Sequence, residues 1–195
     1  MTLEDIGATV ADWVRGARVA KEAGFSGCQL HGAHGFLLSQ FLSPHTNRRT
    51  DEYGGSPEKR LSLLKRLVRE IRQVCPTPYC LSVKLNSADY MAEGGLSQDE
   101  GLEQVRWLVE CGMVDFVEIS GGNAENSTSK LHSPKHLLFH TPNFTNRVTR
   151  FFRPEILGES PRNVPIHPNS RSLLYRIRRT RSSVKLNRPN PAQRR

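Results

Sequence analysis

Residues 24–36 read GFSGCQLHGAHGF, and no other stretch says as much about the fold of this chain. Gly24 is placed to end a helix in a left-handed turn, and residues 25–31 then form a short apolar strand. Two histidines, His31 and His34, stand where this strand gives way to a glycine-rich turn. Polar groups in that position face the ligand in α/β enzymes. Taken alone, a His-x-x-His pair fits two ordinary explanations, a solvated loop or satisfied core histidines, as well as it fits a ligand site.

The same alternation of helix and strand continues through the first two thirds of the chain. The predicted helices cover 6–24, 56–74 and 97–112, and the predicted strands cover 25–31, 79–85 and 114–120. Ser97 and Glu100 form a capping box, in which each side chain satisfies a free N–H of the first helical turn. Helices of about 10–20 residues between short apolar strands indicate right-handed crossovers and a parallel sheet. The predicted fold class is therefore α/β.

Polar groups stand near the end of each predicted strand. Lys84 lies near the end of the second strand, and Ser120 and Gly121 close the third. Because the carboxyl ends of parallel strands meet at one edge of a sheet, we expect these residues to lie close to His31 and His34. This edge is the predicted functional site.

Lys84 carries the most specific signal at this edge, because Val83 and Leu85 flank a cation that a core cannot leave unpaired. An anionic group of a ligand bound at the edge would satisfy it. This is the favoured explanation, and the alternative is a salt bridge to a carboxylate on a neighbouring strand, such as Glu118. The sequence leaves both explanations open.

Positive charge is concentrated at one end of the chain. The protein has 195 residues and a formal net charge of +9. Residues 141–195 contain 13 basic residues (Lys and Arg) and 2 acidic ones (Asp and Glu), whereas residues 1–140 contain 15 basic and 17 acidic residues. From residue 126 onward no helical or strand period persists, and Ser, Asn, Pro and Arg dominate. The sequence therefore predicts a folded domain over 1–125 and a disordered basic tail over 126–195.

The tail suggests an alternative function. A compact basic cluster at 176–181 could contact nucleic acid or other polyanions. Tyr175 is the only aromatic residue near it, whereas single-strand binders usually stack bases on several aromatic rings. The sequence therefore does not favour nucleic acid as a partner, and a tail that binds polyanions without selectivity explains the cluster as well.

Cysteine use and hydropathy bear on the compartment. Four cysteines at irregular spacing match neither a disulfide framework nor a zinc site. The N-terminus resembles no secretory leader, and no run approaches the roughly 18 apolar residues of a membrane span. A cytoplasmic protein without a membrane partner or a metal is predicted.

Residues 16–123 resemble the Old Yellow Enzyme family of FMN-dependent NAD(P)H:flavin oxidoreductases. The motifs that carry the resemblance occur in the family order: AGF at 23–25, HGAHGFLLSQFLSP at 31–44, TNRRTDEYGGS at 46–56, Arg60, VKLN at 83–86 and EISGG at 118–122. The family fold is a (β/α)8 TIM barrel, and the resemblance places the three predicted strands at its fourth to sixth positions. The chain would then hold about three β/α units of that barrel.

The resemblance also implies roles for the residues at the sheet edge. His31 and His34 would hydrogen-bond the carbonyl oxygen of an α,β-unsaturated substrate, while the flavin passes a hydride to the β-carbon. Lys84 would lie beside N1 and O2 of FMN, and Ser120 and Gly121 would contact the cofactor. NAD(P)H would be the electron donor and would bind over the flavin ring, so no separate Rossmann motif is required.

One residue departs from the family pattern. Phe36 stands where the family usually has a Tyr that gives a proton to the α-carbon of the substrate. Phe has no donor, so water or another group must deliver this proton, and the loss of a positioned acid costs about 10²–10⁴ in rate. The nearby residues Arg48, Arg49, Asp51 and Tyr53 are expected to lock the loop over the edge rather than to touch substrate.

A barrel of this kind typically needs about 250 residues. The sequence has no counterpart of the first three strands or of the strands that should follow Gly122. We therefore expect a fragment, whose tail arises from a changed reading frame, a retained intron or a faulty gene model. Such a fragment could be inactive, and an oligomer or partner chain that supplies the missing strands stays open.

Overall fold

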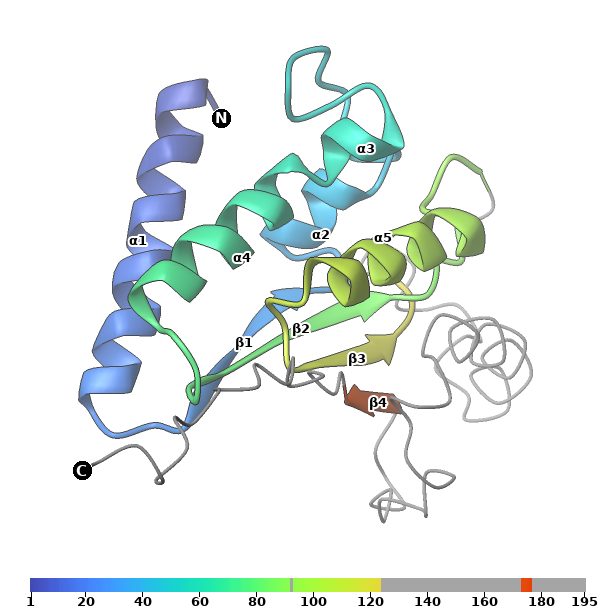
Figure 1. Cartoon of the computed structure of the whole chain (residues 1–195). Helices are drawn as coiled ribbons and strands as arrows, with labels where there is room; N and C mark the ends of the chain where they lie inside the picture. The colour runs from blue at the N-terminus through green and yellow to red at the C-terminus, as the bar shows by residue number, and fades with distance from the viewer. Residues whose placement is uncertain (92, 124–172, 177–195) are drawn as a thin grey trace, which may run out of the picture.

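A computed structural model describes residues 1–91, 93–123 and 173–176 of the chain. Its helices are α1 (Leu3–Glu22), α2 (Leu37–Leu42), α3 (Pro57–Arg60), α4 (Ser62–Val74) and α5 (Gln98–Cys111). Its strands are β1 (Gly27–Gly32), β2 (Cys80–Asn86), β3 (Phe116–Ser120) and β4 (Leu173–Arg176). Figure 1 shows these helices together on one side of the sheet. The predicted α/β class, with the strand order of a partial barrel, is confirmed.

The four strands form one sheet in the order β1-β2-β3-β4. β1 pairs with β2 and β2 with β3 in parallel, whereas β4 runs antiparallel to β3. The register places His31 opposite Lys84, and Lys84 opposite Glu118. Side chains of paired residues lie on the same face, so these three form a row across the sheet.

Local sequence signals account for both ends of the two longest helices, α1 and α5. The predicted capping box of Ser97 and Glu100 starts α5, and Gly112 ends it at a left-handed φ of 61°. Gly24 likewise has a φ of 89°, as predicted. The capping box of Thr2 and Asp5, which the prediction overlooked, starts α1 at Leu3 rather than at residue 6.

One predicted helix differs from the structure, and one observed helix was not predicted. The helix predicted over 56–74 is divided at Leu61 into α3 and α4. The six-residue helix α2 was not predicted, because it is too short to show a helical period. α2 packs against β1, and α3 packs against both α2 and α4, so tertiary contacts rather than periodicity decide these short elements.

β4 corrects part of the prediction for the tail. Residues 126–195 were expected to contain no regular structure, but residues 173–176 form a strand on β3. Four residues are too few to show an alternating pattern, and an unpaired sheet edge can select such a segment through backbone hydrogen bonds. The rest of the predicted tail, including 177–181 of the basic cluster, lies outside the described residues.

The core lies between the helices and one face of the sheet. Leu81, Val83 and Leu85 on β2 are completely buried there, as are Leu64 and Leu67 on α4. Each such side chain stabilises the fold by about 1.5–3 kcal/mol relative to an exposed one. Apolar contacts therefore hold the helices on this face, and the row of His31, Lys84 and Glu118 lies on the other.

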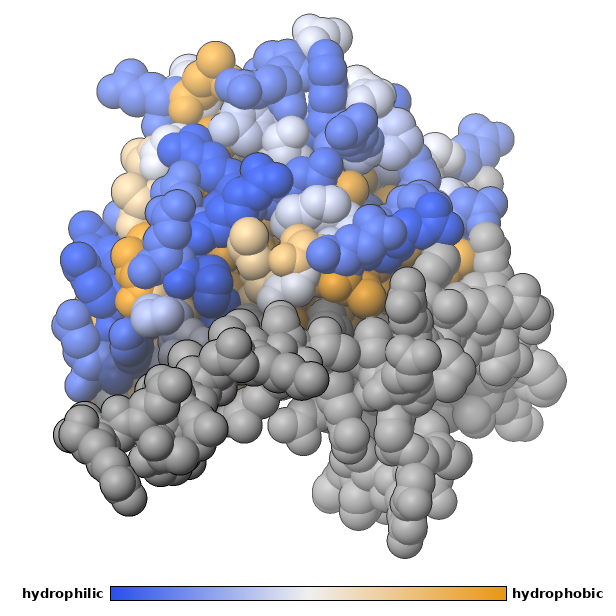
Figure 2. All heavy atoms as spheres, viewed as in Figure 1, coloured by the Kyte–Doolittle hydropathy of each residue, from blue (hydrophilic) through white to orange (hydrophobic). Residues whose placement is uncertain are grey.

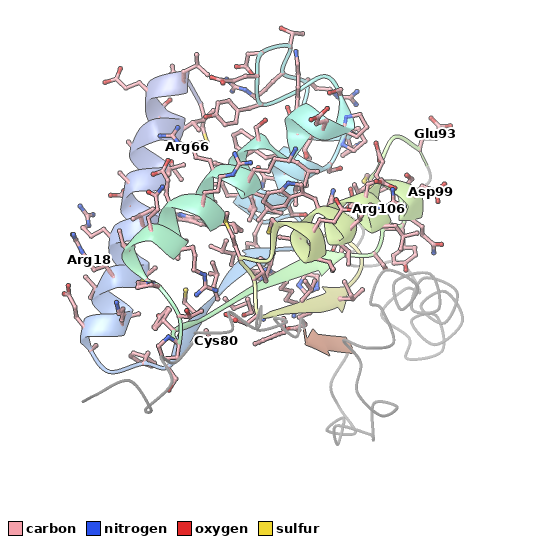
Figure 3. All side chains as sticks on the ribbon, in the orientation of Figure 1. Arg18, Arg66, Cys80, Glu93, Asp99 and Arg106 are labelled. Atoms are coloured by element: carbon pink, nitrogen blue, oxygen red, sulfur yellow. The ribbon has the colours of Figure 1, made fainter. Side chains whose placement is uncertain are left out.

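The helical surface is polar. In Figure 2 hydrophilic residues cover most of the visible outer surface of the helices, with apolar residues between them. Figure 3 shows Arg18 on α1 and Asp99 on α5 extending outward from the ribbon, and both residues are exposed. None of the described helices combines the length and the apolar character needed to cross a membrane.

Candidate functional site

An ion pair forms the centre of the row across the sheet. Lys84 Nζ lies 2.8 Å from Glu118 Oε1, and the two side chains are 18% and 15% exposed. Of the two explanations for the lysine, the salt bridge to Glu118 is therefore the one observed. Because the ammonium is neutralised by a neighbour, any ligand at this edge meets an ion pair rather than an isolated cation.

His31 lies beside this pair and is held in one tautomer. Its Nδ1 accepts a hydrogen bond from the backbone N–H of Ala33 at 3.3 Å. Burial lowers the pKa of His31, the charge of Lys84 lowers it further, and Glu118 opposes both. A neutral imidazole that accepts at Nδ1 must carry its proton on Nε2. His31 is thus prepared to act as a hydrogen-bond donor through Nε2.

His34 is brought next to His31 by an unusual backbone conformation. Its φ is 63°, which is uncommon for a residue other than glycine and is found preferentially at functional sites. The two imidazole centroids are 5.3 Å apart in an edge-to-face arrangement. His34 Nε2 lies 2.6 Å from Ser120 Oγ, so the second histidine is tied to the end of β3. The structure therefore unites the predicted His31, His34 and Ser120.

Phe36 completes the group around the histidines. Its ring centroid is 4.9 Å from that of His31, and the residue is 59% exposed. The predicted position of a proton donor thus lies beside the histidine pair, but its side chain has no proton to give. An exposed phenyl ring there instead offers an apolar surface.

Asn86 was not predicted as a site residue, although it connects all three strand ends. Its Oδ1 accepts the backbone N–H of His34 at 3.3 Å, and its Nδ2 donates to Asp89 Oδ1 at 3.0 Å and to the carbonyl of Gly122 at 2.8 Å. The side chain is almost fully buried. The rule that selected Lys84, a polar residue at a strand end, selects Asn86 as well.

Asp89 is the second linking residue that the prediction overlooked. Its buried carboxylate accepts hydrogen bonds from Ser43 Oγ at 2.5 Å and from the backbone N–H of Leu96 at 2.9 Å, besides that of Asn86. Hydrogen bonds to a carboxylate are stronger than neutral ones and offset the cost of burying the charge. Asp89 therefore fixes the loop after β2 against the segment after α2.

Gly121 lies beneath an aromatic ring. A Cβ atom at this position would be 2.5 Å from Cε2 of Tyr90, so the ring leaves no room for a side chain. The Tyr90 hydroxyl lies 2.8 Å from Ser87 Oγ, and its backbone φ is 54°. The predicted cofactor contact at Gly121 thus borders Tyr90, which no sequence signal singled out.

Side chains of residues 47, 49 and 51 hold the loop over residues 48–53. Arg49 and Asp51 form an ion pair at 2.5 Å, and their mutual hydrogen bonds raise the pKa of Arg49 and lower that of Asp51. Asn47 Nδ2 donates to the carbonyls of Phe41 and Tyr53 at 2.7 Å each.

Within the part of the chain described, no group of three or more His, Cys, Asp or Glu could hold a metal ion.

Comparison with known proteins gives one family. Its sequence model, described as the NADH:flavin oxidoreductase / NADH oxidase family, matches residues 1–143. The chain is 40% identical over 166 residues to the NADH-dependent flavin oxidoreductase iliE of Neonectria sp. (strain DH2). This alignment covers 81% of this chain and 21% of that protein. The chain is also 43% identical over 122 residues to the NADPH dehydrogenase of Bacillus licheniformis, and this alignment covers 63% of this chain and 35% of that protein.

Solved structures give the same answer. A 2-naphthoyl-CoA reductase in complex with 2-naphthoyl-CoA superposes with a TM-score of 0.69 and 30% identity, over 75% of this chain and 22% of the other. Morphinone reductase in complex with tetrahydroNAD superposes with a TM-score of 0.54 and 25% identity, over 78% of this chain and 38% of the other.

These matches confirm the resemblance predicted from the motifs. The chain spans only about a fifth to a third of the length of the relatives with similar sequences. Three observations support the same family: the family match over residues 1–143, the parallel strands, and the meeting of His31, His34 and Lys84 at one edge of the sheet. The chain belongs to the NADH:flavin oxidoreductase / NADH oxidase family, the family of Old Yellow Enzyme.

Proposed function

We propose that this chain carries the central part of an FMN-dependent oxidoreductase site of the ene-reductase type. The observation that supports this most directly is that His31, His34, Lys84 and Ser120, from three separate strand ends, lie at one edge of the sheet. Relatives named as NADH-dependent flavin oxidoreductase and NADPH dehydrogenase support NADH or NADPH as electron donor. The proposed substrates are small α,β-unsaturated carbonyl compounds.

The two histidines would bind the carbonyl oxygen of the substrate. His31 is suited to this because its Nδ1 is occupied by the N–H of Ala33 and its Nε2 is left to donate. Donors that are fixed before the substrate arrives stabilise the charge that develops on its oxygen. His34 would take part through a ring whose orientation is set by Ser120.

The residues near the ends of β2 and β3 would hold the FMN ring. The Lys84 ammonium and the Ser120 hydroxyl, which lie on the face of the sheet opposite the core, would form a polar strip for this ring, bordered at Gly121 by the ring of Tyr90. When bound, FMN supplies the hydride chemistry. The protein would hold the ring on this strip and orient it toward the histidine pair, with Asn86 keeping the three loops in place.

Proton delivery should be slow at this site. Phe36 lies beside His31 where the family places a phenol, and its ring cannot donate. We expect turnover with an activated enone to rise on the order of 10²-fold when Phe36 is replaced by Tyr, since a positioned acid is worth about 10²–10⁴. Stopped-flow reoxidation of the reduced flavin by such an enone would measure the step directly.

The first test is binding of FMN by the purified chain, followed by quenching of flavin fluorescence. Saturable quenching is expected for the wild type and a large loss for the double variant His31→Ala/Lys84→Ala. Lys59→Ala is a matched control, because Lys59 is exposed on α3 and away from the sheet. A well-folded wild-type chain that quenches no FMN would refute the proposal.

A further inference from the structure

Glu118 is the member of the row for which the family motif assigned no role. Its carboxylate lies 2.8 Å from the Lys84 ammonium, and both side chains are more than four-fifths buried. Removing one partner from such a pair leaves the other charge largely buried without its counter-charge, which destabilises the fold. The two residues therefore act on their surroundings as a pair.

The pair lies directly beside His31. Lys84 is opposite His31 in the register of β1 and β2, and Glu118 is opposite Lys84 in the register of β2 and β3. The backbones of neighbouring strands lie about 4.8 Å apart, so Lys84 is attached one strand from His31 and Glu118 two strands away, while their charged ends lie within 2.8 Å of each other. Among the residues that the structure describes, the charged and titratable groups beside His31 are Lys84 from β2, Glu118 from β3 and His34 from the loop after β1.

The row carries one positive and one negative charge, and both act on the histidine. An unbalanced ammonium one strand away would disfavour any positive charge on His31 and would attract any anion to the edge. The carboxylate reduces both effects because it is held against the ammonium in a region of limited solvent access. The electrostatic field at the edge is therefore set by the pair.

We infer that Glu118 is a positioning residue of this site, whose carboxylate holds the Lys84 ammonium in the row and balances its charge. The edge then offers a ligand a neutral ion pair next to a neutral imidazole donor. This inference rests on the proposed function, because the ligand in question is FMN. It follows that Glu118 limits how strongly the site prefers the anionic reduced form of the flavin over the neutral oxidised form.

The row can be tested in the chain without any ligand. Histidine ring signals would be followed by NMR across pH in chain labelled at histidine, with His31 assigned from the signal lost in His31→Gln. The pKa of His31 should fall in Glu118→Gln and stay near the wild-type value in Glu118→Asp, which keeps the charge. Glu103→Gln is the control, since Glu103 is a half-exposed carboxylate on α5 paired with Arg106.

A wild-type pKa of His31 in Glu118→Gln, or a higher one, would overturn the inference. Because a lone buried ammonium could unfold that variant, the comparison is repeated between Lys84→Met and Lys84→Met/Glu118→Gln. The double variant lacks both charges, and the pKa of His31 should be lower in the double variant than in Lys84→Met alone. Equal values in that pair would overturn the inference as well.

Flavin binding separates this inference from the proposed function. Oxidised FMN and FMN reduced with dithionite would be titrated against wild type and Glu118→Gln. The variant should shift the ratio of the two dissociation constants toward reduced FMN on the order of tenfold, the factor that corresponds to one pKa unit of differential interaction. An unchanged ratio refutes the role of Glu118, whereas no binding by the wild type refutes the proposed function and leaves the His31 titration to decide.

Discussion

The two faces of the sheet are formed by the same strands, but one face packs in the hydrophobic core and the other carries the polar row of the site. Leu81 and Val83 of β2 are completely buried against the helices, whereas Ser82 and Lys84 alternate with them on the opposite face and make polar contacts. Successive side chains of a strand point to opposite faces, so core and chemistry are separated by a single residue step. Because a slip of one residue would exchange the faces, the core also fixes the position of the polar row.

The largest effect is expected on the helix face. Leu81→Ala should lower the free energy of unfolding by about 2–5 kcal/mol, because it removes buried apolar contacts and leaves a cavity. Ser82→Ala, one residue away on the polar face, should cost only about 0.5–1.5 kcal/mol for the lost hydrogen bond to the carbonyl of Cys28. Urea unfolding followed by circular dichroism measures both. Equal losses would contradict the division between the faces.

The polar face should be most sensitive at the ion pair. Glu118→Gln should lower the free energy of unfolding by about 3 kcal/mol, the low end for a broken buried ion pair, because it leaves the partly exposed Lys84 ammonium without a counter-charge. The double variant Lys84→Met/Glu118→Gln should recover most of this loss, and the same urea unfolding experiment gives the coupling between the two sites. A double variant as unstable as the sum of the single ones would show that the residues act independently.

A smaller effect is expected at a site that touches neither face. Ser97→Ala should cost about 1 kcal/mol, because the hydroxyl accepts the N–H of Glu100 at the start of α5. Ser97→Asp keeps an acceptor at the cap and should retain near wild-type stability in the same measurement. Should the alanine variant match wild type, the cap would have no energetic role.

The smallest expected effect is a dependence of stability on pH that comes from His31. Its pKa in the folded chain lies below the ordinary value of 6.5, owing to burial and to Lys84. Between the two values the unfolded chain binds more protons, so the free energy of unfolding should fall as pH is lowered from about 6.5. His31→Gln should lose this part of the pH dependence in urea unfolding at several pH values. A steeper dependence in that variant would contradict the assignment.

Sequence patterns alone were sufficient for the three parallel strands and for the meeting of His31, His34, Lys84 and Ser120 at one edge. They failed at β4 and α2, which are too short to show a period, and at the break at Leu61. Asn86 could have been selected by its place at a strand end. Tyr90 could not, because only the folded loop places its ring over Gly121.

What the sequence by itself determined follows from local rules. Apolar residues alternate in strands and recur every three or four residues in helices, while Ser97 and Gly112 mark the two ends of α5. Strand and helix order then implies a parallel sheet, whose carboxyl edge collects the residues that follow each strand. These features need no knowledge of contacts between distant residues.

The tertiary structure decided how those residues are paired. Lys84 could have met a ligand or Glu118, and only the register of β2 against β3 selects the carboxylate. His31 and Asn86 likewise obtain their hydrogen-bond partners from the way the loops fold, and residues 34 and 86 are 52 positions apart in the chain. The charge of a site depends on distances between side chains from separate strands, and a linear pattern does not contain those distances.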